Sequence, residues 1–208
     1  LGSASAMADH LRAELVEATL VSNVESLFVL DTSESNATLL EACESESLFH
    51  PAPILNLRVR NWSRLLADYT AAGSPVRAIR IHPNYHFYDL SHPAVDELAA
   101  ALEAADLPLV IAPRIFDERL HDPMMQVPGI PMREIVAFAA RHEGLKVLCV
   151  NAYKPEIVGA DAPRNLWFDI AFAEYFKTMS TLRQSVAADR LVFGSNAPIR
   201  MPRPGRAE

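Results

Sequence analysis

The sequence has few of the residues that mark specialised protein classes. Its 208 residues include only two cysteines, Cys43 and Cys149, which are far apart in the chain. Two such cysteines neither build a zinc site nor require a disulfide, and Cys149 lies in an apolar stretch where we expect a buried thiol. Because the N-terminal residues also lack the basic region of a signal peptide, we expect a cytoplasmic location.

Long apolar runs and basic runs are also absent. No apolar stretch approaches the ~20 residues that span a bilayer, so we expect no membrane association. The net charge is -7, the pI is about 5.5, and no Lys or Arg run offsets this balance, which argues against nucleic-acid binding. The length and the 50% hydrophobic content suit one domain with a sizeable core, so we expect residues 1–208 to form a single domain.

What the chain does contain is an alternation of strand and helix patterns. Short apolar segments bounded by polar residues predict strands at Ser26–Leu30, Ile54–Arg58, Val76–Ile81, Leu109–Ala112, Lys146–Val150, Leu166–Ile170 and Leu191–Gly194. Apolar residues at helical spacing predict helices at Leu11–Thr19, Ser63–Ala72, Ala94–Ala105, Met132–His142 and Glu174–Ala187.

This alternation predicts an α/β protein with a parallel sheet covered by helices. Two architectures agree with it, namely an open doubly wound sheet and a (β/α)8 TIM-barrel-like fold that lacks one strand. No Gly-rich phosphate loop follows any of the strands, so the dinucleotide-binding form of the open sheet loses support.

A dense polar cluster follows the strand Val76–Ile81. It consists of His82, Asn84, Tyr85, His86 and Tyr88. Because active sites of α/β barrels form where the strands end, we expect this cluster to line a pocket. Both histidines can titrate near neutrality, so His82 and His86 are the candidate acid–base groups, although His82 could instead bond to backbone and His86 could be exposed to solvent.

Other strands also end in polar residues. Arg114 and Arg119 follow the strand at Leu109–Ala112 and could form an anion clamp, or a solvated loop with internal ion pairs. Asn151, Asp169 and Asn196 end the three strands that follow and are further candidate ligand-binding residues.

Three segments resemble the amidohydrolase superfamily, in its branch of metal-dependent hydrolases of the TIM-barrel fold. The stretch from Ile79 to His86 is similar to the fourth strand of that barrel, Asn165–Asp169 to its seventh, and Asp189–Pro198 to its eighth. The resemblance implies a (β/α)8 barrel, with the first strand and the last helix apparently missing from this chain, and a hydrolase activity. We would expect further residues or a second copy of the chain to cover the exposed sheet edges.

The resemblance also implies a divalent metal, which the family holds with a His-x-His pair on strand one, a His on each of strands five and six, and an Asp on strand eight. This chain has Ala112-Pro113, Asn151 and Asn196 at the last three of these positions. Ala is no ligand and Asn is a poor zinc ligand, so we expect no metal-binding residue and no cofactor, unless zinc ligands lie outside the chain.

The most direct hypothesis is therefore an amidohydrolase-related barrel with a degenerate metal site that binds a small anionic organic ligand at its C-terminal face. One alternative is an active hydrolase or lyase whose metal ligands lie partly outside the chain. Another is a catalytically inactive barrel with a structural or interaction role.

Overall fold

Helices and strands alternate along the chain, as the sequence patterns predict. The computed structural model describes residues 3–117, 122, 124, 126–173 and 177–197. The elements, in chain order, are α1 (Ala4–Ala13), β1 (Thr19–Val21), η1 (Val24–Leu27), α2 (Ser33–Glu44), β2 (Phe49–Pro51), α3 (Trp62–Thr70), β3 (Ile79–Ile81), α4 (Pro93–Ala104), β4 (Leu109–Ile111), α5 (Met132–Arg141), β5 (Val147–Cys149), α6 (Lys154–Gly159), β6 (Leu166–Asp169), α7 (Thr178–Leu182), η3 (Ala188–Arg190) and β7 (Leu191–Val192). None of these helices has the length and apolar character needed to cross a membrane.

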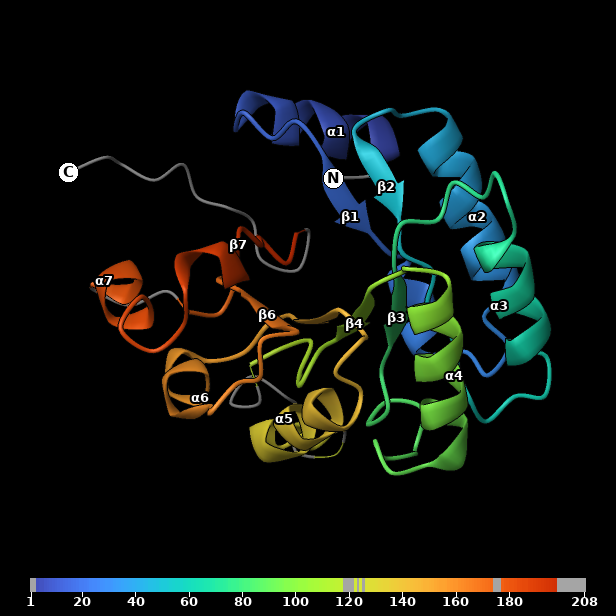
Figure 1. The fold of residues 1–208 in the computed structure, drawn as a ribbon. Helices are drawn as coiled ribbons and strands as arrows, with labels where there is room; N and C mark the ends of the chain where they lie inside the picture. The colour runs from blue at the N-terminus through green and yellow to red at the C-terminus, as the bar shows by residue number, and fades with distance from the viewer. Residues whose placement is uncertain (1–2, 118–121, 123, 125, 174–176, 198–208) are drawn as a thin grey trace.

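Every strand pair in the described residues is parallel. β1 pairs with β2, and β3 to β7 form a five-stranded sheet in sequence order. A single parallel bridge between Ile54 and Arg80 joins the two sheets. The seven strands therefore follow one another around a curved wall, with β1 and β7 at its two edges (Figure 1). This is the predicted (β/α)8-type barrel. Among the described residues no strand lies between β7 and β1, and we call this gap the seam.

The strands are apolar on both faces because both faces are buried, as is usual for parallel sheets. One face packs against the helices in the largest cluster of buried side chains, in which Ile79, Ile81, Leu109 and Ile111 are fully buried. The other face points into the barrel, where Val110 and Val150 lie in a second, smaller cluster. Along each strand, successive side chains therefore point alternately into the barrel and towards the helices.

The helices that cover β3 to β5 confirm the helical patterns in the sequence. In α4 the predicted apolar stripe at Val95, Leu98, Ala99 and Leu102 is fully buried, and Pro93 occupies the first turn. In α5, Ile135 and Phe138 are likewise fully buried. These two helices could be predicted because the exposed and buried faces alternate with the helical period.

The N-terminal part of the chain corrects two of our predictions. The predicted strand Ser26–Leu30 is wrong, since η1 includes Ser26 and Leu27, and Phe28 and Leu30 are 67% and 76% exposed. The side chain of Asn23 accepts a hydrogen bond from the backbone N–H of Glu25 and so starts a turn. The predicted helix Leu11–Thr19 is also wrong, because α1 ends at Ala13 and Thr19 begins β1.

The second strand is likewise earlier than predicted. It spans Phe49–Pro51, whereas the predicted segment Ile54–Arg58 contributes only the bridge at Ile54. Pro51 and Pro53 interrupt the hydrogen-bonding pattern between the two segments, because proline has no N–H to donate. The helix α2, which precedes this strand, had no counterpart among the predicted elements.

Candidate functional site

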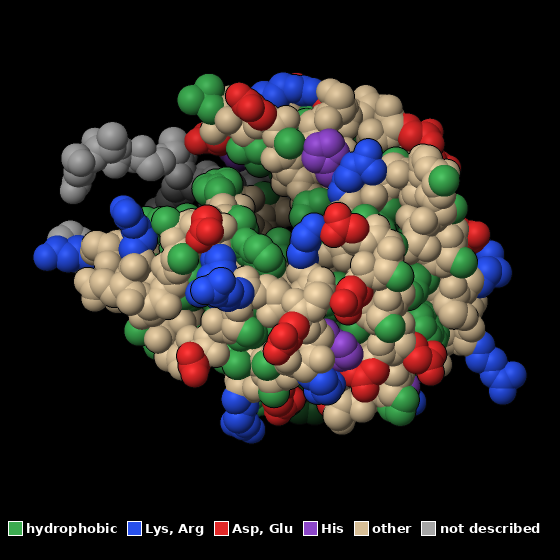
Figure 2. Space-filling view, in the orientation of Figure 1, with side chains coloured by type: hydrophobic (Ala, Val, Ile, Leu, Met, Phe, Trp, Pro, Cys, Tyr) green, Lys and Arg blue, Asp and Glu red, His purple; other side chains and the backbone are tan. Residues whose placement is uncertain are grey.

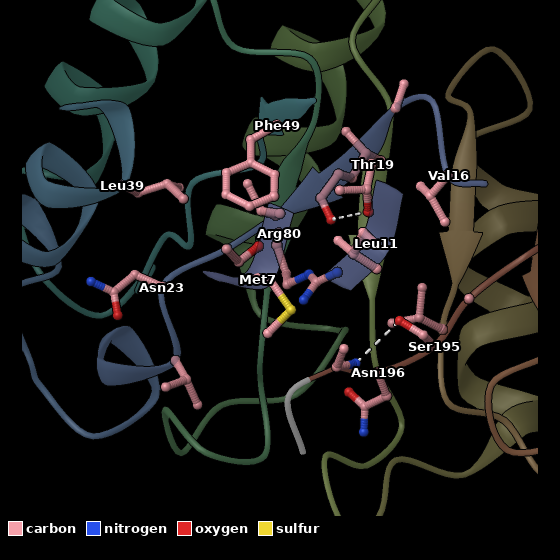
Figure 3. A pocket seen from close by; sticks show the side chains of 18 of the residues that line it. Met7, Leu11, Val16, Thr19, Asn23, Leu39, Phe49, Arg80, Ser195 and Asn196 are labelled. Atoms are coloured by element: carbon pink, nitrogen blue, oxygen red, sulfur yellow. Dashed lines mark hydrogen bonds between the residues drawn. The ribbon is translucent and has the colours of Figure 1, made fainter. Parts of the chain in front are cut away.

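A cavity of about 770 Å3 lies along the open seam of the barrel. One wall comes from α1, β1, α2 and β2, and the other comes from the ends of β5, β6 and β7. In the space-filling view the surface is hollowed beside the N-terminal helix (Figure 2). Arg80 of β3 reaches into the cavity between the two walls (Figure 3).

Arg80 is the one charged residue of β3. Its neighbours Ile79 and Ile81 point towards the helices, so the alternation of a strand directs Arg80 into the barrel. The Nε atom is buried and has no hydrogen-bond partner among the described residues, and none of their carboxylates pairs with the guanidinium. Burial lowers the pKa of Arg80 to about 10, partly offset by the charge of Asp169.

Arg80 is not among the site residues predicted from the sequence. A signal was present, because Arg80 interrupts an otherwise apolar strand at a position whose two neighbours are both isoleucine. In a strand buried on both faces, a charge at such a position must lie inside the barrel, where it requires a partner or a ligand.

Asp169, Asn151 and Asn196 do come together at the ends of β5, β6 and β7. Asp169 Oδ1 accepts a hydrogen bond from the backbone N–H of Asn151 at 2.8 Å. The Nδ2 of Asn151 donates to Asn196 Oδ1 at 3.3 Å and to the carbonyl of Arg114 at 3.0 Å. Asn196 Nδ2 in turn donates to the carbonyl of Ile115 at 3.0 Å. Three candidate residues thus form one network on the cavity wall.

Asp169 is the ionisable member of this network. Its side chain is buried, and desolvation raises its pKa to about 6, although the backbone N–H groups of Asn151 and Ala171 and the charge of Arg80 act in the opposite direction. The carboxyl group fits only because residue 194 is glycine: a Cβ atom there would lie 2.2 Å from Asp169 Oδ2.

The cluster after β3 folds back on itself. The backbone N–H of His86 donates to the carbonyl of His82, and that of Tyr88 to the carbonyl of Pro83, both at 3.0 Å. The two histidines are 1% and 4% exposed, and Tyr85 packs edge-on against His82. Asn84 donates to the carbonyls of Pro113 and Pro128, at 3.3 and 3.0 Å.

The histidines of this cluster are shielded from water. Burial is the main cause that lowers the pKa of both, and His82 also lies near the charge of Arg80. His86 Nε2 bonds with the carbonyl of Ser26 at 2.9 Å, and the Nδ1 atoms of both rings have no partner among the described residues. In the described part of the chain, neither histidine nor Asn84, Tyr85 or Tyr88 is on the wall of the cavity. Acid–base roles for His82 and His86 stay predictions.

Arg114 is in an internal ion pair and does not face the cavity. Its two Nη atoms each contact a carboxylate oxygen of Glu156 at 2.6 Å, and its guanidinium stacks on the ring of Tyr153 at 4.0 Å. Of the two roles that the sequence left open for this loop, the structure of Arg114 agrees with the internal ion pair. Arg119 lies outside the described residues.

The evidence for the family comes from the sequence itself. A family model for amidohydrolases matches residues 64–208, which is most of the chain. The chain belongs to the amidohydrolase family. A search of curated proteins with this sequence found no match.

Solved structures similar to this amidohydrolase-family chain show the same fold. A 5-carboxyvanillate decarboxylase from Novosphingobium aromaticivorans has a TM-score of 0.71 and 14% identity, over 92% of this chain and 69% of that one. A 2,6-dihydroxybenzoate decarboxylase from Rhizobium has a TM-score of 0.66 and 13% identity, over 93% and 77%. An uncharacterised TIM-barrel protein from Bordetella bronchiseptica has a TM-score of 0.66 and 15% identity, over 93% and 70%. Against similar solved structures the chain spans 61% to 77% of their length.

These structures correct the expectation that no cofactor is involved. Decarboxylases from Novosphingobium aromaticivorans and Polaromonas were crystallised with bound manganese, so a divalent metal is among the cofactors used on this fold. The residues described here do not supply a ligand set by themselves, since no group of three or more His, Cys, Asp or Glu side chains converges among them. The amides of Asn151 and Asn196 are hydrogen-bonded to each other and to backbone. We therefore assign no chemical step to a metal.

Proposed function

We propose that this amidohydrolase-family barrel is a lyase that removes carbon dioxide from a small organic carboxylate at the ends of β5, β6 and β7. The family supports a reaction on a small molecule at this end of the barrel. The solved relatives named above include decarboxylases, and one of them was crystallised with 4-hydroxy-3-methoxy-5-nitrobenzoic acid, an anionic aromatic compound.

The observation that carries this proposal is the buried carboxyl group of Asp169 on the cavity wall. In decarboxylation the bond between the substrate carbon and its carboxylate breaks, carbon dioxide leaves, and the electron pair on the carbon takes up a proton. A group with a pKa of about 6 can hold that proton near neutral pH and release it to a carbon atom in the cavity. Solvent then returns a proton to Asp169.

The surrounding residues hold Asp169 in place for this step. Its Oδ1 atom accepts a hydrogen bond from the backbone N–H of Asn151, and Gly194 allows the segment after β7 to approach Oδ2 closely. The amides of Asn151 and Asn196 fix the loops on either side of the carboxyl group. Asp169 is therefore a proton-transfer group of fixed position, and the two asparagines are positioning residues.

The direct test is carbon dioxide release from 2,6-dihydroxybenzoate and 5-carboxyvanillate, with manganese present in the assay. We expect turnover by the unaltered chain and a loss of about 100-fold or more in kcat for Asp169→Asn, because the amide cannot donate the proton. Since the protonated form of Asp169 is the active one, kcat should fall as the pH rises through about 6.

The control is Asp161→Asn, which removes the same charge from an exposed site. This variant should keep both the rate and the pH profile. Turnover by Asp169→Asn at the unaltered rate, or hydrolysis of an amide or ester substrate in place of carbon dioxide release, would refute the proposal.

A further inference from the structure

We infer that Arg114 and Glu156 are positioning residues, which hold the backbone N–H of Asn151 on the carboxyl group of Asp169. This inference rests on the proposed function, because it gives these two residues a part in the proton transfer at Asp169. The contacts that carry it join the ends of β4, β5 and β6, which are three adjacent strands, to the first turn of α6.

The first step is the pairing of Arg114 with Glu156. Nη1 and Nη2 of Arg114 each donate to one carboxylate oxygen of Glu156 at 2.6 Å, and the guanidinium lies 4.0 Å from the ring centroid of Tyr153. The carboxylate of Glu156 also accepts a hydrogen bond from the backbone N–H of Tyr153 at 2.7 Å. Two parallel hydrogen bonds and a stacked ring hold the buried guanidinium in one orientation.

The second step is the contact between Arg114 and Asn151. Nη1 of Arg114 also donates to the carbonyl of Asn151 at 3.2 Å, and the carbonyl of Arg114 accepts a hydrogen bond from Asn151 Nδ2 at 3.0 Å. The two residues are thus bonded in both directions. The backbone of Asn151 is left-handed, with a φ of 62°, and this conformation persists only where surrounding contacts hold it.

The third step is the remaining polar group of the Asn151 backbone. Its N–H donates to Asp169 Oδ1 at 2.8 Å. A hydrogen bond of this kind stabilises the ionised carboxylate and fixes the direction of the carboxyl group. Since Arg114 holds both the carbonyl and the side chain of Asn151, a displacement of Arg114 would also displace this N–H. Arg114 and Glu156 therefore act on Asp169 through Asn151.

The test is a nuclear magnetic resonance titration of the full chain, which needs neither substrate nor turnover. We expect the amide proton of Asn151 to move downfield as Asp169 ionises, because an N–H bonds more strongly to a carboxylate than to a carboxylic acid. Asp169→Asn identifies the carboxyl signal of Asp169. This variant should also abolish the movement of the Asn151 signal.

The decisive variant is Arg114→Met/Glu156→Met, which removes one charge of each sign and so keeps the net charge beside Asp169. The movement of the Asn151 signal should fall to about half or less, and the pKa of Asp169 should rise above about 6, because the carboxylate loses a donor. Arg80 on β3 and Cys149 on β5 also interact with Asp169, and both stay in place.

Arg114→Lys is a milder second variant. It keeps the charge but loses the paired N–H groups, so it should reduce the movement of the Asn151 signal by a smaller amount. In the turnover assay, the double variant should lower kcat by about tenfold with little change in KM, because it disturbs the proton transfer and not the binding of substrate.

Two controls separate positioning from charge and from stability. Arg64→Met/Asp68→Met removes an exposed ion pair and should leave the titration of Asp169 and Asn151 unchanged. Asn165→Ala removes hydrogen bonds to three backbone carbonyls, at 2.8 to 2.9 Å, before the start of β6. It should lower stability without changing either titration. Thermal unfolding establishes that each variant is folded.

An unchanged Asn151 signal in either Arg114→Lys or the folded double variant would overturn the inference, and so would an equal change in Asn165→Ala. The result is separate from that of the proposed function. If Asp169→Asn loses turnover but the double variant titrates normally, the lyase proposal stands and the positioning role is wrong. If the double variant changes the titration but Asp169→Asn keeps full turnover, the contacts are supported and the lyase proposal fails.

Discussion

The two faces of the sheet in this protein are built differently. The face under the helices is closed and apolar, and its largest side chains, such as Phe138, Phe168 and Leu98, are fully buried. The face inside the barrel has a smaller apolar cluster and includes Arg80 and Asp169, beside a cavity of about 770 Å3. The first face stabilises the fold, and the second keeps polar groups at a cost in stability.

On the helix-covered face, only similar apolar residues can replace the native side chains. Inside the barrel, a polar side chain can lie without a stabilising partner. Buried polar groups without partners destabilise a protein, so their presence indicates a ligand more strongly than the presence of a charge on the surface does. The buried Nε atom of Arg80 meets this criterion, whereas Arg114 does not, because Glu156 neutralises it.

The largest effect should come from the helix-covered face. Phe138→Ala should lower the free energy of unfolding by about 3–5 kcal/mol, because it leaves a cavity in a closed core. Urea denaturation measures this change. Phe87→Ala is the matched control, since Phe87 is 79% exposed, and we expect a change within about 0.5 kcal/mol. Similar losses in both variants would contradict the contrast between closed core and surface.

The next effect should come from the ion pair beside the strand ends. Arg114→Met should lower the free energy of unfolding by roughly 2–4 kcal/mol, because it leaves the partly buried carboxylate of Glu156 without its partner. Arg64→Met breaks an exposed pair with Asp68 and should cost less than about 0.5 kcal/mol. A negligible loss for Arg114→Met would show that the pair is not needed for the fold.

A smaller effect should come from the contact between Gly194, which follows β7, and Asp169. Gly194→Ala should cost about 1–3 kcal/mol in unfolding free energy, because the added Cβ would overlap Asp169 Oδ2. It should also reduce turnover, since the carboxyl group must move. Gly159→Ala is the control: no atom lies within 4 Å of its added Cβ, so we expect stability to stay the same or rise by less than about 1 kcal/mol.

The smallest effect has the opposite sign. Arg80→Met should raise the free energy of unfolding by about 1 kcal/mol in the absence of ligand, because it removes an unpaired charge from the barrel interior. A loss of stability in Arg80→Met would mean that the guanidinium contributes to the fold and would remove the contrast between the two faces.

Helices and strands were predicted correctly in some parts of the chain and not in others. The helices α4 and α5 were predictable because their buried stripes have the helical period, and the strands β3 to β6 because they are short apolar segments between such helices. The first two strands were not, because the apolar residues of Ser26–Leu30 are largely exposed and the prolines near β2 hide its pairing. A periodicity in sequence does not show which apolar residues have a neighbouring element to pack against.

The sequence also indicated three members of the polar network, Asn151, Asp169 and Asn196, because each lies at or near the C-terminal end of a predicted strand. It could not show that they bond to one another, or that Arg114 pairs with Glu156, since each contact joins residues far apart in the chain. It predicted a pocket role for the histidine cluster, and this stays a prediction: His82 and His86 are buried in a turn and do not line the cavity described above.

By itself, therefore, the sequence determined the alternating architecture, the parallel sheet, the barrel and the family, because these follow from local patterns of apolar residues and from short motifs. Only the tertiary structure decided which cation is paired and which is not. Arg80 and Arg114 are similar as residues, but whether a charge is neutralised depends on what lies within a few ångströms in space, and the packing of strands that are distant in sequence sets those distances.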